Sequence, residues 1–313
     1  MLPKPGTQAF YLVSIALLFL LGASFGLTFS LSKMTAGIIG PGTFIFWQTL
    51  GAGLILAFAL QVRKQLFPIP GRLVWLAAIS GTVFFALPNL IYMRALVEVP
   101  AGLAAVMIAT LPFYSYAMAL GFRSERFTWM RFAGLIIGFI GVMLIVLPDS
   151  AIPSPTTIPW LIVIVFLPLA YAIQNYMLER LLPADASPFQ FTTLLLLFAA
   201  AFAYPVFLWE GGDYLPKYET QADLAMVAMI VLSAFNFALL FFLVTWRGAV
   251  FTSQNGNIIT ITALIWAFLI LGEQPSPWIY LATVFILGGT TLVSLTRRAP
   301  LQDEGEQSDQ AGD

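Results

Sequence analysis

Residues 100–146 begin with Pro100-Ala101-Gly102-Leu103-Ala104-Ala105, continue as an apolar run broken by Pro112, and reach the charged turn Arg123-Ser124-Glu125-Arg126. A second apolar run follows and carries Gly134, Gly138 and Gly141. About 20 apolar residues, at about 1.5 Å each, cross a bilayer core of about 30 Å, so the stretch predicts two membrane-spanning helices that pair as a hairpin. The glycines lie at i, i+4 and i+7 and give the second helix a smooth face for close helix packing. A second hairpin of this kind is predicted for Gly248 to Leu295.

The composition indicates an all-α polytopic membrane protein. Of 313 residues, 60% are hydrophobic and 9% are charged, against about 25% charged in soluble domains. The chain has no cysteine and no histidine, which excludes disulfides, imidazole-based zinc sites and a Ser-His-Asp relay. It also has no phosphate-binding Gly-x-x-x-x-Gly-Lys loop. We therefore expect no enzyme activity, metal or cofactor, and neither ATP nor nucleic acid as a partner. The expected partners are the lipid bilayer and a small-molecule substrate.

The chain divides into ten apolar segments joined by short turns. Their predicted spans are 9–32, 41–62, 73–95, 101–121, 129–147, 158–178, 188–209, 223–246, 249–271 and 277–296. Residues 9–147 and 158–296 form two five-helix halves. The polar, acidic segment 297–313 is predicted to be a disordered cytoplasmic tail.

The distribution of Lys and Arg predicts the orientation. If the N-terminus is cytoplasmic, only Lys33, Arg94 and Lys217 of the 14 basic residues fall on the opposite side. Basic residues prefer cytoplasmic loops, so both termini are expected in the cytoplasm.

An internal repeat appears when the halves are shifted by about 147 residues. Gly40-Pro41-Gly42-Thr43-Phe44 then aligns with Ser187-Pro188-Phe189-Gln190-Phe191, and Asn89 aligns with Asn236; one residue further, Glu125 aligns with Glu273. Because five is odd, the second half must enter the membrane from the opposite side. Inverted repeats of this kind are typical of transporters, with the substrate site near the midplane between the halves.

Several residues of the first half carry a family resemblance: Tyr92, Ala95-Leu96, Pro100-Ala101-Gly102, Ala104-Ala105, Pro112, Gly121, Glu125, Gly134, Gly138 and Gly141-Val142. The second half keeps Gly272-Glu273-Gln274-Pro275 and Gly288-Gly289. This pattern resembles the drug/metabolite transporter superfamily, in its ten-helix branch with two EamA-type domains. One departure is Trp47-Gln48, which stands where many relatives carry an arginine.

The resemblance implies export or exchange of small metabolites across the inner membrane. A branch of similar organisation exports aromatic and other neutral amino acids, which is the leading expectation for the substrate. Efflux of drug-like hydrophobic compounds is the alternative within transport, and a membrane receptor or scaffold is the alternative outside it. The acidic residues lie near helix ends, and the first helix has no glutamate. We therefore expect facilitated alternating access without proton antiport of the kind that uses a glutamate in the first helix.

Neutral polar and aromatic residues at membrane depth are the candidate substrate-binding residues. They are Trp47, Thr82, Phe85, Asn89, Tyr92, Tyr171, Asn175, Ser233, Asn236, Gln254, Asn255 and Asn257. Thr82, Phe85, Asn89 and Tyr92 would form one stripe on a regular α-helix. Each polar residue has a structural alternative, which is a hydrogen bond between helices. We expect helices 3, 4, 8 and 9 to surround a central cavity, helices 5 and 10 to be peripheral, and the protein to be a monomer. Asn89 and Asn236 are predicted to contact the substrate.

Overall fold

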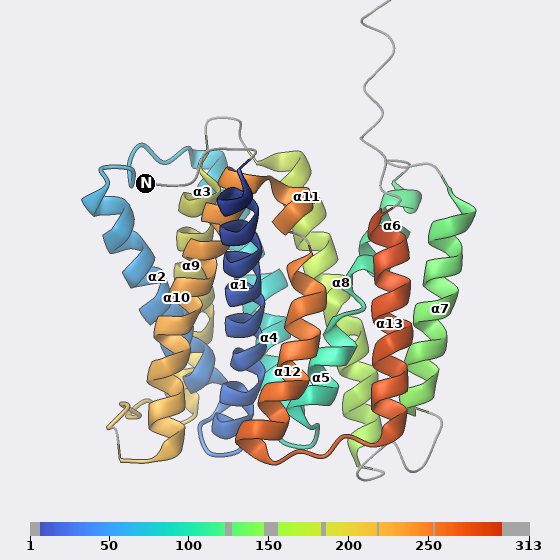
Figure 1. Cartoon of the computed structure of the whole chain (residues 1–313). Coiled ribbons are helices and arrows are strands. Elements are labelled where there is room, and N and C mark those ends of the chain that lie inside the picture. Colours follow the sequence, from blue (N-terminus) through green and yellow to red (C-terminus); the bar gives the residue numbers. More distant parts are fainter. Residues whose placement is uncertain are drawn as a thin grey trace, which may run out of the picture.

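The apolar runs fold as helices that end at the turn residues (Figure 1). The structure, a computed structural model, describes residues 7–122, 127–146, 156–182, 186–217, 219–252 and 254–295. Its helices are α1 (Gln8–Thr35), α2 (Pro41–Val62), α3 (Gly71–Ile79), η1 (Ser80–Ala86), α4 (Leu87–Ala95), α5 (Ala101–Ile108), α6 (Leu111–Gly121), α7 (Trp129–Val146), α8 (Thr157–Leu181), α9 (Pro188–Trp209), α10 (Gln221–Arg247), α11 (Ala249–Thr252), α12 (Asn255–Leu271) and α13 (Pro277–Leu295).

The ten predicted segments are confirmed. Seven continuous or composite helices in the described part of the chain are long and apolar enough to cross a membrane, and α7, α12 and α13 contribute three shorter apolar helices. Many of their large apolar side chains face outward, including Phe58, Trp75 and Val284, as lipid contact requires. The predicted tail 297–313 and Glu125 lie outside the described residues. Below, the end of the bundle where α1 begins is called the Gln8 end, and the opposite end is called the Glu273 end (Figure 1).

Three of the ten segments are interrupted, two of them near a proline. In the third, the Leu87 N–H donates to the Thr82 carbonyl, five residues back, and η1 is a π-helix. Pro88 follows at once and has no N–H to continue a regular α-helix. The regular spacing assumed for Thr82, Phe85, Asn89 and Tyr92 is therefore wrong across η1. The fourth segment breaks between α5 and α6, just before Pro112, and the ninth breaks between α11 and α12.

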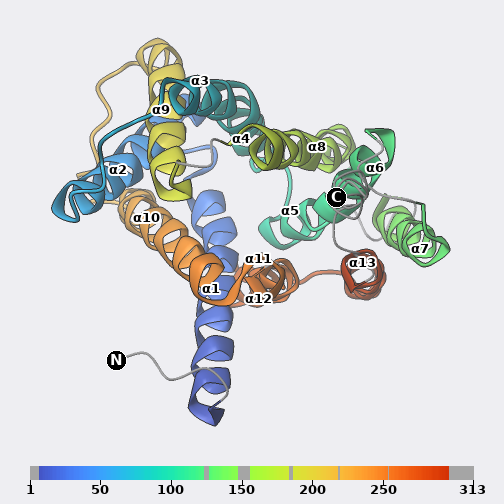
Figure 2. The ribbon, with the colours of Figure 1, turned by 90° about the horizontal axis from the view of Figure 1, so that it is seen from above.

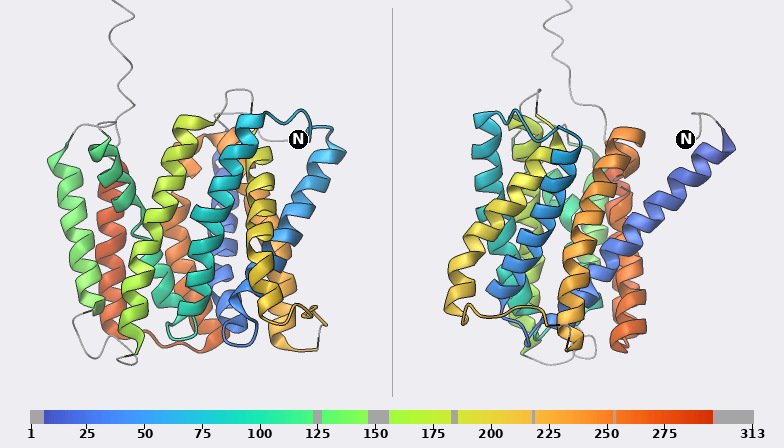
Figure 3. Two further views of the ribbon diagram at one scale, coloured as in Figure 1. Left: turned by 180° about the vertical axis from the view of Figure 1, so that it is seen from behind. Right: turned by 90° about the vertical axis from the view of Figure 1, so that its left-hand side faces the viewer.

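The two halves are interleaved rather than side by side. The first helix of each half packs against the third and fourth of the other: α1 against α10 and α12, and α8 against η1, α4, α5 and α6. The second helices, α2 and α9, pack together along their length. Seen along the bundle, α1 crosses beneath α10, and α7 and α13 stand together at one edge (Figure 2). The inclination of α1 to the other helices is clearest from the side (Figure 3).

The predicted hairpins are wrong in their pairing. Instead of packing mainly against its neighbour in sequence, α7 packs against α13, the last helix of the other half. The smooth face predicted for α7 is the contact surface: Gly134 lies against the Gly289 carbonyl, and Gly141 lies against Ile286. Ile136 on the same helix is exposed. The fifth and tenth segments, α7 and α13, are therefore peripheral, as expected, because each packs its glycine face against the other.

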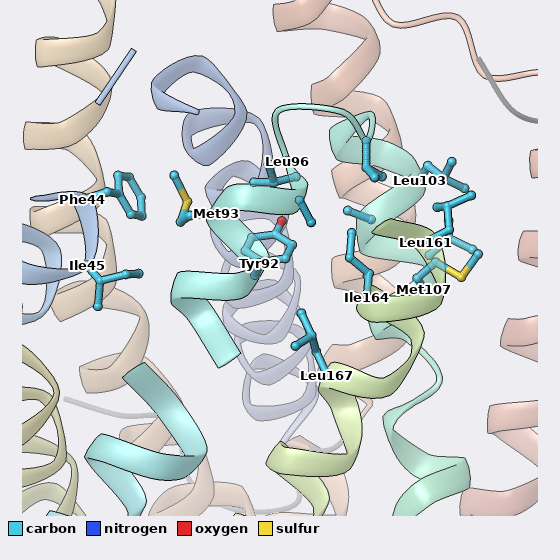
Figure 4. Packing of buried hydrophobic residues seen from close by; sticks show 14 of the residues in the cluster. Phe44, Ile45, Tyr92, Met93, Leu96, Leu103, Met107, Leu161, Ile164 and Leu167 are labelled. Carbon is cyan, nitrogen blue, oxygen red and sulfur yellow. The ribbon is translucent and has the colours of Figure 1, made fainter. Parts of the chain in front are cut away.

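The largest hydrophobic cluster lies where the halves meet. In it, Leu103 and Met107 of α5 approach Leu161 and Ile164 of α8 (Figure 4). The same cluster includes Tyr92. The core therefore joins the two halves and fixes α5 between α8 and α12.

Candidate functional site

Helices α5 and α12 are tied together at the Glu273 end. The Glu273 carboxylate accepts hydrogen bonds from the backbone N–H groups of Ala101 (2.8 Å) and Gly102 (3.1 Å) at the start of α5. Gly272 directs Glu273 to this place, because it ends α12 with φ 65°, a left-handed conformation that favours glycine. A carboxylate at a helix N-terminus satisfies free N–H groups and complements the helix dipole.

Lys33 binds the loop that joins α4 to α5. Its Nζ donates to the carbonyls of Leu96, Val97 (3.3 Å) and Val99 (3.1 Å), which follow the end of α4. Lys33 and Glu273 also attract each other electrostatically. The Lys33 cation of α1 therefore holds the carbonyl groups of this short loop. The Glu273 anion, at the end of α12, holds the N–H groups that follow the loop.

The two parts of the fourth segment, α5 and α6, pack against different helices. α5 packs against α12, α1 and α8, whereas α6 packs mainly against α8 and α13. The Tyr114 hydroxyl on α6 donates to the Val165 carbonyl of α8 (2.8 Å). Consequently α5 meets α12 near the Glu273 end, and α6 turns away from it toward the Gln8 end (Figures 1 and 2).

Five predicted site residues lie on η1, α4 and α8, and the structure links four of them: Phe85, Asn89, Tyr92 and Tyr171. The Asn89 amide donates to the Phe85 carbonyl (2.8 Å) and is a hydrogen-bond partner of the Tyr171 side chain. Thr82 donates to the Ala78 carbonyl within its own helix. Tyr92 is 7% exposed, and its hydroxyl has no hydrogen-bond partner in the part of the chain that the structure describes. Its ring lies among the buried residues of α4 and α8 (Figure 4).

Three further predicted residues lie on α10 and α12, where these helices meet α1 and α2. Asn236 is fully buried; its carbonyl oxygen accepts from the Ser24 hydroxyl of α1, and its amide nitrogen has no partner within the described segments. Ser233 accepts from the Gln48 amide of α2 (3.0 Å). Asn255 is buried beside α1, and its side-chain oxygen has no partner among the described residues. The hydrogen bond between Ser24 and Asn236 joins α1 to α10, so the side-chain oxygen of Asn236 holds two helices together.

The remaining four predicted residues lie apart from both groups. Asn257 bonds to Thr290 and Thr291 of α13. Asn175 is exposed, and Gln254 stands at the start of α12. The Trp47 indole donates to the Tyr214 carbonyl (3.0 Å) and packs edge-on against Phe207, near the Glu273 end.

Sequence reasoning missed the acidic ties between the halves. Glu210, which follows α9, accepts from the N–H groups of Gly42 (3.0 Å) and Thr43 (2.8 Å) and from the Thr43 hydroxyl (2.9 Å) at the start of α2. The signal was present in the sequence. α2 and α5 begin after Gly40 and Pro100, which have no capping side chain, so their N–H groups need an acceptor from elsewhere.

The Tyr214 hydroxyl beside this tie donates to Asp223 (2.6 Å). Burial, followed by the Asp223 carboxylate, raises the pKa of Tyr214 above its usual value. The hydroxyl therefore remains a donor at neutral pH.

Both groups offer neutral chemistry: amides, hydroxyls and aromatic rings. Within the residues that the structure describes, no three His, Cys, Asp or Glu side chains gather in a way that could hold a metal ion. Amide groups provide donors and acceptors together, and ring faces provide apolar contact. The arrangement suits a small molecule that has both polar and apolar parts.

Ten apolar segments in two interleaved halves define a polytopic α-helical membrane protein. Residues 12–147 and residues 158–295 each match the EamA-like transporter family. The chain belongs to this family of transporters.

Individual relatives are distant. A probable terminal-alkyne amino-acid exporter of Streptantibioticus cattleyicolor is 26% identical over 203 residues, covering 63% of this chain and 65% of the exporter. The uncharacterized inner membrane transporter YedA of Escherichia coli is 29% identical over 99 residues, 31% of each chain. Less than two thirds of either relative is therefore covered. A solved crystal structure matches with a TM-score of 0.63 at 16% identity, over 89% of this chain and 96% of the other, and it shows the fold alone.

Proposed function

We propose that this protein exports small neutral amino acids, aromatic ones included, by facilitated alternating access. The observation that carries the proposal is the divided fourth segment. α5 is tied to α12 at one end, and α6 leaves α12 toward the other. The fourth segment therefore contacts α12 at the Glu273 end and leaves it toward the Gln8 end, and alternating access requires that arrangement and its opposite.

The orientation is part of the proposal. Both termini lie in the cytoplasm, so that the Gln8 end is cytoplasmic and the Glu273 end is outer. The support is the distribution of basic residues, of which only Lys33, Arg94 and Lys217 fall at the outer end. The protein acts in the inner membrane as a monomer, because one chain already carries both repeats.

The chemistry of the site residues favours a zwitterion. The two groups contain no ionised side chain, so a substrate with a net charge would lack a counter-ion at depth. Asn89 and Asn236 supply donors and acceptors for a carboxylate and an ammonium group, and Tyr92 and Tyr171 supply rings for an apolar side chain. The relative named as an amino-acid exporter supports the same class.

Counterflow in proteoliposomes tests the proposal. Vesicles that contain the purified protein are loaded with unlabelled phenylalanine, leucine or serine, and uptake of the labelled amino acid is compared with that of a hydrophobic cation. We expect counterflow of the neutral amino acids with no imposed pH gradient. Transport of the cation alone would favour drug efflux. No flux with any compound, from protein that is correctly inserted, would favour a receptor or scaffold.

A further inference from the structure

We propose that Glu273 and Lys33 form the outer gate of the transporter: together they hold the loop 96–100 and the start of α5 against α12 and α1, and releasing them opens the Glu273 end. This inference rests on the proposed alternating access. It assigns a role in the transport cycle to two residues that lie outside the groups of candidate substrate-binding residues.

Two charged side chains from elsewhere in the chain hold the loop 96–100 and the start of α5. The carbonyls of the loop converge on the Lys33 ammonium group, and the N–H groups that follow it converge on the Glu273 carboxylate. Both contacts place a charge on the helix end of opposite partial charge. Neither residue belongs to the segment that it holds, so the contacts join separate helices and can be broken without unfolding one.

Glu210 makes a tie similar to that of Glu273, but it joins a different pair of helices. Glu210 joins α2 to α9 at the Glu273 end, and at the other end the Gln190 amide donates to the carbonyls of Gln65 (2.8 Å), Leu66 and Pro68. The pair α2–α9 is therefore fastened at both ends. Glu273 ties α5 to α12 at one end only, because α6 takes other partners. A tie at one end of two diverging helices controls whether that end opens.

The tie between Glu273 and α5 covers residues of α12. Gly102 packs against Leu264 and Ala267 of α12. Leu264 is 9% exposed, and Ala267 is fully buried. Separation of α5 from α12 would uncover Ala267, so this residue reports on the gate. Ala282 is equally buried, but it lies between α13 and α7, away from the gate.

Cysteine labelling tests the proposal directly, because the natural chain has no cysteine. Ala267→Cys and Ala282→Cys are each introduced into the full chain, and their reaction with a hydrophilic maleimide is timed in detergent, where both ends are accessible. We expect Glu273→Gln to speed labelling at 267 about tenfold, the ratio that corresponds to about 1.4 kcal/mol. Lys33→Met should act in the same direction, and Lys33→Arg should act less. Labelling at 282 should not change.

Glu210→Gln is the matched control, since it removes the same charge from a similar tie and should leave labelling at 267 unchanged. Three results would overturn the gate: unchanged labelling at 267 in both Glu273→Gln and Lys33→Met, equal acceleration at 267 and 282, or an equal effect of Glu210→Gln. The measurement needs no substrate. Accelerated labelling without amino-acid flux would therefore keep the gate and refute the proposed function, whereas amino-acid flux with unchanged labelling would do the reverse.

Discussion

Gly289→Ala should destabilise the protein, whereas Gly288→Ala should not. A Cβ at position 289 would lie 2.5 Å from the Gly134 carbonyl oxygen and 2.8 Å from the Gly138 nitrogen, so two helix backbones must move apart. Overpacking of this kind costs about 1–3 kcal/mol. A Cβ at position 288 meets no described atom within 4 Å, and alanine there gains up to about 1 kcal/mol of helix propensity over glycine.

Thermal unfolding in one detergent, followed by circular dichroism, measures the difference between the two variants. We expect the free energies of unfolding to differ by roughly 1–4 kcal/mol, which corresponds to roughly 2–10 °C in Tm. The two substitutions add the same methyl group to adjacent residues, so composition and average hydrophobicity are identical. Equal melting temperatures would show that α7 and α13 are not in backbone contact, and the pairing of the last helices would be wrong.

Three further outcomes are expected. Asn89→Leu and Asn236→Leu should insert and fold but lose most counterflow of neutral amino acids. Ser24→Ala is the control for the helix contact of Asn236. Wild-type rates in both asparagine variants would refute their role. Glu210→Ala should lower the free energy of unfolding by about 1–3 kcal/mol, because three hydrogen-bond donors lose their acceptor; denaturation midpoints that match the wild type would contradict this. An imposed pH gradient should not drive uptake, and strong uptake that one carboxylate substitution abolishes would establish proton coupling instead.

The sequence predicted the spans well, because the bilayer sets the length of each apolar run and Gly, Pro and charged residues end it. For example, the predicted segment 41–62 is α2 without change. Pairing was harder. The glycines of α7 revealed which face packs, but a smooth face does not identify its partner, and the partner was α13, more than a hundred residues away.

The candidate site was predicted in part, for a similar reason. Polarity at depth pointed to Asn89 and Tyr171, which the structure joins. It also pointed to Asn257, which bonds to α13 instead, because composition does not say which side of a helix faces a neighbour. The π-helix around Thr82 changes the rotation of the third segment, and periodicity that assumes a regular helix cannot anticipate it.

The interleaving of the halves has a consequence for biogenesis. α1 leaves the ribosome well before α10 and α12, its main partners. Until they arrive, the Gly22 and Gly26 face of α1 and the Ser24 hydroxyl have neither the helix backbones nor the amide that cover them in the finished protein. The repeated unit of the sequence is thus not the unit that assembles. The first half must therefore remain in the bilayer without these helix contacts until the second half has been inserted.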